Sequence, residues 1–338
     1  MAVGADNEMD YAQRAKRVQR TIAAVLVFSL AVFIAISAFA VLSEGSEKFI
    51  ATLLSVNPLY YAMAFLCVFL SDLVGFPKWH MFIKKLGVKV KMKDNLPIYL
   101  SMFSMDITPG RLGRAVVSYT LNKLTGVRFV KTLPAVIADI FTDYLGFVVI
   151  TLISALLVRR YLPLSITISM ILLLPFVFIY TRAPYKFFKR KFGSYRRLRG
   201  IFKHGDMFYR SHSLLDLGSY TYAMIFTIPA MTLNGISLYF VMLSVGISLP
   251  LSYIPTILFI FTSAMLIGMI TGIPGTLGVT DAALLGYLVI FFGNKGVSVG
   301  VASAITILFR IASIWFAVGM SMIFLLYTTK YWKNAKSS

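Results

Sequence analysis

Ionisable side chains recur inside segments of this sequence that are otherwise strongly apolar. An ionisable group at the centre of a bilayer costs at least about 2.5–3.5 kcal/mol, so each one requires an ion-pair partner or a ligand. Asp139 and Asp143 are four residues apart, which places both carboxylates on one face of a helix. The candidate residues of this kind are Asp72, Asp106, Arg111, Arg114, Asp139, Asp143, Asp281 and Arg310.

The three arginines of this set suit a phosphate ligand. A guanidinium group offers parallel N–H donors that match phosphate oxygens, and a helix N-terminus adds free N–H groups and a positive dipole end. Arg111 and Arg114 lie at a Pro-Gly break, and Arg310 falls twelve residues into a span that begins at Ser298. We therefore predict that Arg111, Arg114 and Arg310 receive a phosphate group.

The carboxylates have two interpretations. Asp139 and Asp143 require a cation, which any of the three arginines could supply, and Asp281 suits the first turn of a helix because the helix dipole favours a negative charge there. We predict that these three balance the arginines and contact a cationic or sugar head group. The alternative for the whole set is internal salt bridges that only fix helix packing. That alternative is favoured for Asp72, which lies close to Lys78 near an expected membrane interface.

Several enzyme classes are excluded by what the sequence lacks. The single cysteine, Cys67, rules out a cysteine-based zinc site or an iron–sulfur cluster. There is no phosphate-binding Gly-x-x-x-x-Gly-Lys-Ser/Thr loop and no His-Glu-x-x-His pair. The histidines lie at or beyond the ends of apolar segments. We predict a protein that is not an enzyme and that uses no metal and no cofactor.

The composition indicates an all-α integral membrane protein. Hydrophobic residues make up 58% of the 338 residues and charged residues 14%, and the mean hydropathy is +0.80. Crossing the hydrocarbon takes about 20 apolar residues. The first apolar block is too long for a signal peptide and is interpreted as an uncleaved anchor. The predicted full spans are 21–42, 58–81, 132–158, 162–181, 219–243 and 298–327.

Two further apolar regions, 96–121 and 252–293, are interrupted by the same pattern, Pro-Gly-x-Leu-Gly. Proline lacks the N–H that a helix needs and glycine loses backbone order, so both regions should break there. Each break lies between a preceding span and a following span, which indicates an internal repeat. The residues predicted to form the breaks are Pro109, Gly110, Gly113, Pro274, Gly275 and Gly278.

The distribution of basic residues predicts how these regions enter the membrane. The chain has 33 Lys and Arg against 13 Asp and Glu, and the cations gather between alternate spans, as cytoplasmic loops do. With both termini cytoplasmic, region 96–121 enters and leaves on the inner face and region 252–293 on the outer face. We therefore predict about six full spans plus two re-entrant helical hairpins in an inverted repeat. The alternative is that each region is a pair of ordinary short helices with a proline kink.

This topology divides the sequence into a short tail, one membrane domain and a second tail. The basic and aromatic loop in the middle is predicted to be either an interfacial helix on anionic lipid or a plain cytoplasmic loop. The predicted divisions are a cytoplasmic tail 1–20, a transmembrane domain 21–330 with repeats 58–158 and 219–327 around the loop 182–216, and a cytoplasmic tail 331–338.

The two broken regions resemble a known family. The string Thr-Pro-Gly-Arg-Leu-Gly-Arg at 108–114, followed by the acidic pair at 139–143, resembles the first signature of the lysylphosphatidylglycerol synthase transmembrane (flippase-like) family. The string Gly-Ile-Pro-Gly-Thr-Leu-Gly-Val-Thr-Asp at 272–281, followed by Arg310, resembles the second. The resemblance covers roughly residues 15–330 and implies a membrane domain that moves lipids between leaflets. In the best-known members the lipid is aminoacylated phosphatidylglycerol, and other members are fused to glycosyltransferases that use polyprenyl-phosphate lipids.

The sequence departs from this family at two charged positions. The family usually has Glu where this chain has Arg114 and Asp281, so the charge is reversed at the first position and kept at the second. The sequence stops shortly after its last span, so we expect no soluble aminoacyl-transferase domain and no lipid synthesis.

These observations predict a lipid flippase or scramblase that moves an aminoacylated phospholipid or a polyprenyl-phosphate-linked lipid between leaflets. The expected partners are anionic or phosphate-bearing membrane lipids and not nucleic acid, and the expected location is the plasma membrane. The first alternative is a small-solute or ion carrier with inverted repeats. The second is a non-catalytic membrane partner of a glycosyltransferase.

Overall fold

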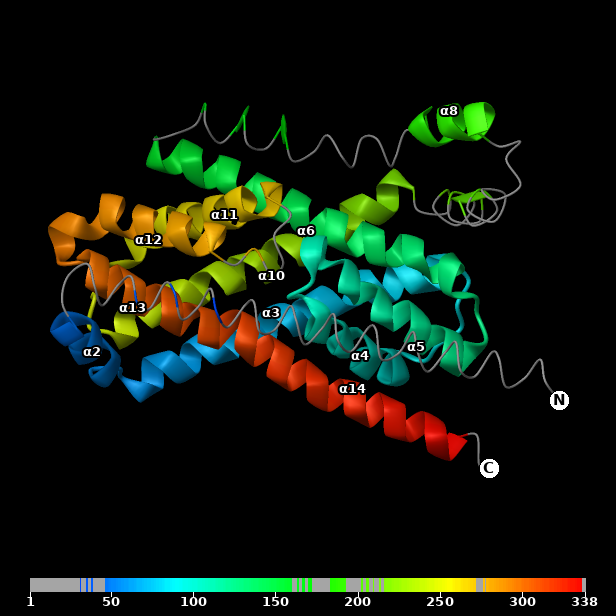
Figure 1. Ribbon diagram of the computed structural model, residues 1–338, viewed down its shortest axis with the longest axis horizontal. Helices are drawn as coiled ribbons and strands as arrows, with labels where there is room; N and C mark the ends of the chain where they lie inside the picture. The colour runs from blue at the N-terminus through cyan, green and yellow to red at the C-terminus, as the bar shows by residue number, and fades with distance from the viewer. Residues whose placement is uncertain are drawn as a thin grey trace.

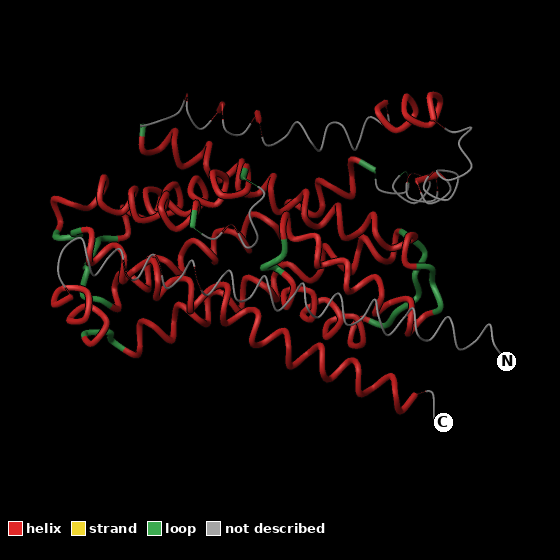
Figure 2. The backbone as a smooth tube through the Cα atoms, in the orientation of Figure 1, coloured by secondary structure: helices red, strands yellow, loops and turns green. Residues whose placement is uncertain are grey.

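The computed structural model describes residues 46–159, 183–192, 216–271 and 278–335, together with isolated positions between them. All regular structure within these ranges is helical (Figure 2). The prediction of an all-α integral membrane protein is confirmed. The predicted spans 21–42 and 162–181, most of the basic loop, Pro274 and Gly275 lie outside the described residues. Within the described ranges, the helical segments long and apolar enough to cross a membrane are Pro58–Lys85, Phe129–Val158, Leu217–Ser244, Leu251–Met269 and Val299–Thr328.

The long helices run along the longest axis of the molecule (Figure 1). They are α3 (Pro58–Lys85), α6 (Phe129–Val158), α10 (Leu217–Ser244) and a continuous rod of α13 (Val299–Arg310), a π-helical segment (Ile311–Trp315) and α14 (Phe316–Ala335). Two short helices, α2 (Ser46–Leu54) and α8 (Ala183–Phe192), lie at the edges of the bundle (Figure 1).

Polar caps fix where two of the long helices begin. The Asn57 side chain accepts hydrogen bonds from the backbone N–H groups of residues 59 and 60, and a proline occupies the first helical position of α3. Asp216 caps α10 by accepting from the backbone N–H of Ser219. Hydrogen bonds from Lys85 and Ser219 lower the pKa of Asp216 below its ordinary value, which keeps the cap ionised. The Lys85 Nζ–Asp216 Oδ1 contact of 2.8 Å ties the end of α3 to the start of α10.

Both Pro-Gly regions are broken helices. The first consists of α4 (Met92–Ser101), two 3₁₀ turns (Met102–Met105 and Pro109–Ala115) and α5 (Val116–Thr125). The second consists of a 3₁₀ turn (Leu251–Tyr253), α11 (Ile254–Ile270), α12 (Val279–Phe292) and a terminal 3₁₀ turn (Gly293–Lys295). Helices α4 and α5 lie in one half of the long axis, and α11 and α12 lie in the opposite half (Figure 1).

The broken regions and the long helices pack in the same pattern in both halves of the bundle. Helix α3 packs along α10, its counterpart before the second break. Helix α11 packs on α6, which follows the first break, and α4 packs on α14, which follows the second. Each broken region therefore packs on the span that follows the other one. These three contacts map onto one another when the two groups of helices are exchanged.

The third residue of each Pro-Gly-x-Leu-Gly motif has the same unusual backbone. Arg111 has φ 58° and Thr276 has φ 56°, in the left-handed region that non-glycine residues rarely adopt. Gly113 closes the first break by donating its N–H to Thr108 Oγ1 at 2.7 Å. A Cβ on Gly113 would lie 2.6 Å from the Thr108 side chain and 2.7 Å from Met105. The glycine is therefore required by the close approach of the chain to itself.

Aromatic packing holds the first broken region against α3. Trp79 is fully buried and donates from Nε1 to Asn95 Oδ1 on α4 at 3.1 Å. The Asn95 amide nitrogen lies 2.9 Å from Nδ1 of His80. The ring of Tyr99 packs between those of Phe76 and Trp79 on α3 and that of Phe103, which follows α4. This packing fixes the side of α3 that faces the break.

Gly113→Ala should destabilise the protein, because the new Cβ must displace the chain at residues 105–108. Overpacking of this kind costs about 1–3 kcal/mol. The matched control is Gly286→Ala in α12, where nothing lies within 4 Å of the added Cβ and the helix gains a better helix former. Thermal unfolding of the purified protein in detergent measures both. Equal unfolding temperatures for the two variants would contradict the steric role of Gly113.

Candidate functional site

A buried cluster of charges joins α3, α6 and the first broken region. Asp139 and Asp143 lie on one face of α6 and both are buried. Lys78 of α3 donates from Nζ to Asp143 Oδ1 at 2.5 Å and to Thr142 Oγ1 at 3.2 Å. Asp139 Oδ1 lies 3.3 Å from the same Nζ, within ion-pair range but without hydrogen-bond geometry. The lysine thus bridges the two carboxylates.

Arg114 is shared among three carboxylates. Its Nη1 donates to Asp139 Oδ2 and to Asp143 Oδ2, each at 2.9 Å. Its Nε and Nη2 form a two-pronged contact with Asp106, at 2.5 and 2.7 Å. The guanidinium carbon lies 5.0 Å from the ring centroid of Phe103. The planar, five-donor guanidinium suits this arrangement, which a lysine could not reproduce.

Arg111 is the cation of the cluster that is least buried. Its Nη1 donates to Asp143 Oδ2 at 3.1 Å, and its side chain is 17% exposed, compared with 2% for Lys78 and for Arg114. Asp106 lies 3.9 Å from its Nε. Because Arg111 follows the Pro-Gly break directly, the left-handed backbone at this residue sets the direction in which the side chain leaves the chain.

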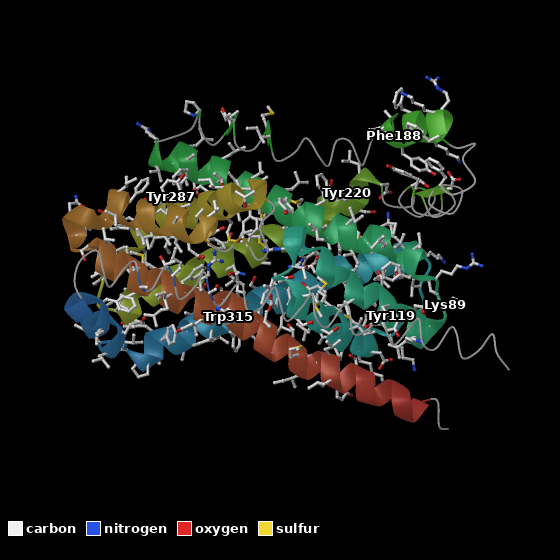
Figure 3. The ribbon with its side chains drawn as sticks, viewed as in Figure 1. Lys89, Tyr119, Phe188, Tyr220, Tyr287 and Trp315 are labelled. Carbon is white, nitrogen blue, oxygen red and sulfur yellow. The ribbon has the colours of Figure 1, made fainter. Side chains whose placement is uncertain are left out.

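A second buried ion pair joins the two elements after the second break. Arg310, at the end of α13, donates from Nε to Asp281 Oδ1. Asp281 also caps α12, accepting from the backbone N–H of Gly278 at 2.8 Å. Arg310 Nη2 is buried and has no hydrogen-bond partner in the part of the chain that the structure describes. The π-helical segment begins at the next residue and ends at Trp315, midway along the long axis in Figure 3. Such π segments are frequent at functional sites.

The two ion-pair systems have the same separation and opposite polarity. Arg114 of the first broken region pairs with Asp143 of α6, 29 residues later. Asp281 of the second broken region pairs with Arg310 of α13, also 29 residues later. The broken region supplies the cation in the first half and the carboxylate in the second.

One pocket brings both systems together. It has a volume of about 80 Å³, which is enough for a few water molecules. Its polar lining comes from α3, the first broken region, α6, α10 and the end of α13. The charged residues that line it are Asp72, Lys78, Asp106, Arg111, Arg114, Asp143 and Arg310.

The structure therefore brings the predicted site residues together, but the ion-pair partner of Arg310 is not one of the two α6 carboxylates. Arg111 and Arg114 supply the cations that Asp139 and Asp143 require, and Arg310 pairs with Asp281 instead. Of the residues predicted to form the breaks, Pro109, Gly110 and Gly113 lie in the 3₁₀ turn Pro109–Ala115, and Gly278 caps α12 with φ 83°.

The expected pairing of Asp72 with Lys78 is wrong. Lys78 pairs with Asp139 and Asp143, and Asp72 lines the central pocket with its Oδ2 buried and unpartnered among the described residues. Six residues along an α-helix turn the side chain by about 600°, so the two side chains point about 120° apart. The six-residue spacing was therefore the signal in the sequence that argued against this pairing. With Asp72 included, the cluster contains three cations and four carboxylates. The cations are Lys78, Arg111 and Arg114, and the carboxylates are Asp72, Asp106, Asp139 and Asp143.

The described residues offer no group of three or more His, Cys, Asp or Glu side chains arranged to hold a metal ion. The site is instead a set of fixed opposite charges in a low-dielectric surrounding. Such a site can bind a charged ligand when the ligand replaces one of the internal ion-pair partners.

Two comparisons with known proteins bear on this site. The family described as lysylphosphatidylglycerol synthase TM region matches residues 23–320, which include both breaks and both ion-pair systems. A protein of Methanothermobacter thermautotrophicus named "UPF0104 membrane protein" is 26% identical over 310 residues, covering 83% of this chain and 89% of the relative.

Asp143→Asn should destabilise the protein more than Asp72→Asn, although both change a buried aspartate of the same pocket. Asp143 contacts three cations, and breaking a buried pair costs about 3–5 kcal/mol because the remaining charges are left uncompensated. The unpartnered Asp72 oxygen has no such contact to lose. Unfolding free energies in mixed micelles measure both variants. An equal loss would contradict the assignment of the charge balance to Asp143.

Proposed function

The chain belongs to the family described as lysylphosphatidylglycerol synthase TM region, and from this premise we propose that it moves a phosphate-containing lipid between the leaflets of its membrane. The family is one of membrane proteins linked to lipid handling. The observation that carries the proposal is a pocket lined by Arg111 and Arg310, within a bundle of membrane-spanning helices.

These two arginines have the donors that a phosphate needs. Arg310 Nη2 is buried without a partner among the described residues, and an unmade hydrogen bond of a buried charged group is costly. The Arg111 side chain is partly exposed and, among the described residues, makes one hydrogen bond, to Asp143 Oδ2 at 3.1 Å. Its remaining N–H groups can therefore turn to a ligand. A phosphate between the two guanidinium groups would complete the hydrogen bonding of Arg310.

Matched charges along the path lower the barrier to crossing. An ionic head group cannot enter bare hydrocarbon cheaply, whereas its tails are at home there. In the proposed mechanism the lipid phosphate replaces Asp143 as the partner of Arg111, while Lys78 and Arg114 keep the carboxylates of α6 neutralised. The head group crosses among these charges and the tails remain in the bilayer. Because no bond is made or broken, the proposed activity is transport and not catalysis.

The symmetric packing supports an alternating mechanism. The pocket of about 80 Å³ is too small for a lipid head group, so helices must separate to admit one. Two observations support two re-entrant hairpins in an inverted repeat. The α4–α14 contact corresponds to the α11–α6 contact when the two halves are exchanged. The pair α4–α5 and the pair α11–α12 lie in opposite halves of the long axis (Figure 1). In transporters of this kind the two repeats rock about a central site.

The charges at the ends of the bundle support an orientation. Lys84, Lys85 and Lys89 lie where α3 ends, and Arg128 and Lys131 lie where α6 begins. Lys89 marks this end in Figure 3, the end toward which α14 runs in Figure 1. Basic segments stay in the cytoplasm. We propose that this end and both termini are cytoplasmic, in the plasma membrane, and that the lipid is an aminoacylated phospholipid or a polyprenyl-phosphate-linked lipid.

Arg111→Ala and Arg310→Ala should each slow lipid movement in liposomes reconstituted with labelled phospholipids and polyprenyl-phosphate lipids. Loss of one charge-assisted hydrogen bond costs about 1.5–3 kcal/mol, which is roughly a tenfold to hundredfold decrease in rate. Arg128→Ala is the matched control, because Arg128 is exposed at the start of α6 and outside the pocket. Each variant is first compared with the wild type by thermal unfolding. Equal rates in all four proteins would refute the site, and no movement in any of them would refute the activity.

The small volume of the pocket favours one other function, a carrier of small anions. The same liposomes can be loaded with radiolabelled inorganic phosphate. Phosphate efflux that depends on Arg111, without lipid movement, would indicate that the substrate is a free anion and not a lipid.

A further inference from the structure

A second cavity of about 310 Å³ lies at the end of the bundle where α3 ends, apart from the central pocket. It is formed by the α3–α4 connection, the start of α4, the end of α5 and the end of α14. The residues that define its character are Lys89, Lys91, Lys93, Asp94, Leu124 and Tyr327. None of them lines the central pocket. Its volume falls within the range of about 300–1,000 Å³ that is typical of ligand sites.

The lining of this cavity is positively charged. Three ammonium groups face one carboxylate, Asp94, so the formal charge of these side chains is three minus one, or +2. The N-terminus of α4 also opens here, and no side chain caps it, because its N-cap residue is Lys91. Lysines and the uncapped N–H groups of α4 both favour an anion.

The remaining walls are apolar except for Thr125 and Thr328, and they lie at the level where spans end. Val90, Pro97 and Leu124 contribute apolar surface, and Tyr327 is 58% exposed at the end of a candidate span. Tyrosines at such positions lie at the head-group level of a bilayer. Basic pockets between transmembrane helices on the cytoplasmic side bind anionic lipid head groups. The cavity therefore offers cations for a phosphate and apolar surface for the glycerol and the first carbons of the acyl chains.

We propose that this cavity binds the phosphate diester of an anionic phospholipid of the adjacent leaflet, as a site separate from the central pocket. The lysines hold the phosphate, the α4 N-terminus adds donors, and Tyr327 packs beside the lipid. Occupation joins α4 of the first broken region to α14, which continues the rod that begins with α13 and Arg310, and so stabilises their contact.

The test places the photoreactive residue p-benzoylphenylalanine at Tyr327 in the full chain, reconstituted in vesicles of phosphatidylglycerol and phosphatidylcholine. After irradiation, mass spectrometry gives the ratio of the two lipids in the cross-linked adducts. The same probe at Ile323, which is 68% exposed one turn away and outside the cavity, gives the ratio for bulk lipid. We expect phosphatidylglycerol to be enriched roughly tenfold at 327 over 323.

Replacement of Lys89, Lys91 and Lys93 together by Ala should abolish the enrichment. Replacement of Lys186, Arg190 and Lys191 on α8 by Ala removes the same charge from another exposed basic segment and should leave the enrichment unchanged. Equal ratios at 327 and 323, or enrichment that survives in the first triple variant, would overturn the proposal. So would equal loss in both triple variants, which indicates general attraction to the surface. Loss on adding inorganic phosphate, but not chloride of equal ionic strength, would assign the cavity to a free anion instead of a lipid.

Discussion

The neutralisation of charge inside an apolar bundle is the constraint on which this structure depends. Arg114 contacts Asp106, Asp139 and Asp143 at once, so a single side chain links the break in the first region to the face of α6. Removing water from these groups would be prohibitive without such contacts, and the contacts in turn fix where α3, α6 and the broken region lie. The burial of Lys78 is possible for the same reason, because its ammonium group lies between Asp139 and Asp143.

The same constraint explains why a pocket exists where the charges are. Helices packed by apolar side chains alone could close completely. Where guanidinium and carboxylate groups meet, the packing is set by hydrogen-bond geometry, and space remains between Arg111, Asp72 and Arg310. A site that binds by exchange of partners needs both features: charges that are already desolvated, and one charge that is incompletely held.

The sequence was sufficient for the helical class, for both breaks and for most of the charged residues, because each depends on local chemistry, whereas Lys78 was not among the predicted site residues. A Pro-Gly pair followed by a second glycine three residues later disfavours a continuous helix, and a charged side chain in an apolar helix calls for a partner or a role. The partners themselves could not be predicted, since they depend on how distant helices are rotated. Lys78 was paired with Asp72 by proximity in the sequence, whereas the helical rotation points it at Asp139 and Asp143. The π-helical segment after Arg310 has no signal in its residues and depends on tertiary packing.

The opposite polarity of the two 29-residue pairs has a consequence for how distant relatives are identified. Each 29-residue pair joins one cation to one carboxylate, and the order of the two along the chain is reversed between the halves. A profile that scores each column separately treats a reversed pair as two mismatches, even though the pair still joins opposite charges. Scoring the two columns jointly, by the sum of their charges, would retain such homologues and would reveal how often the sign has been exchanged during divergence.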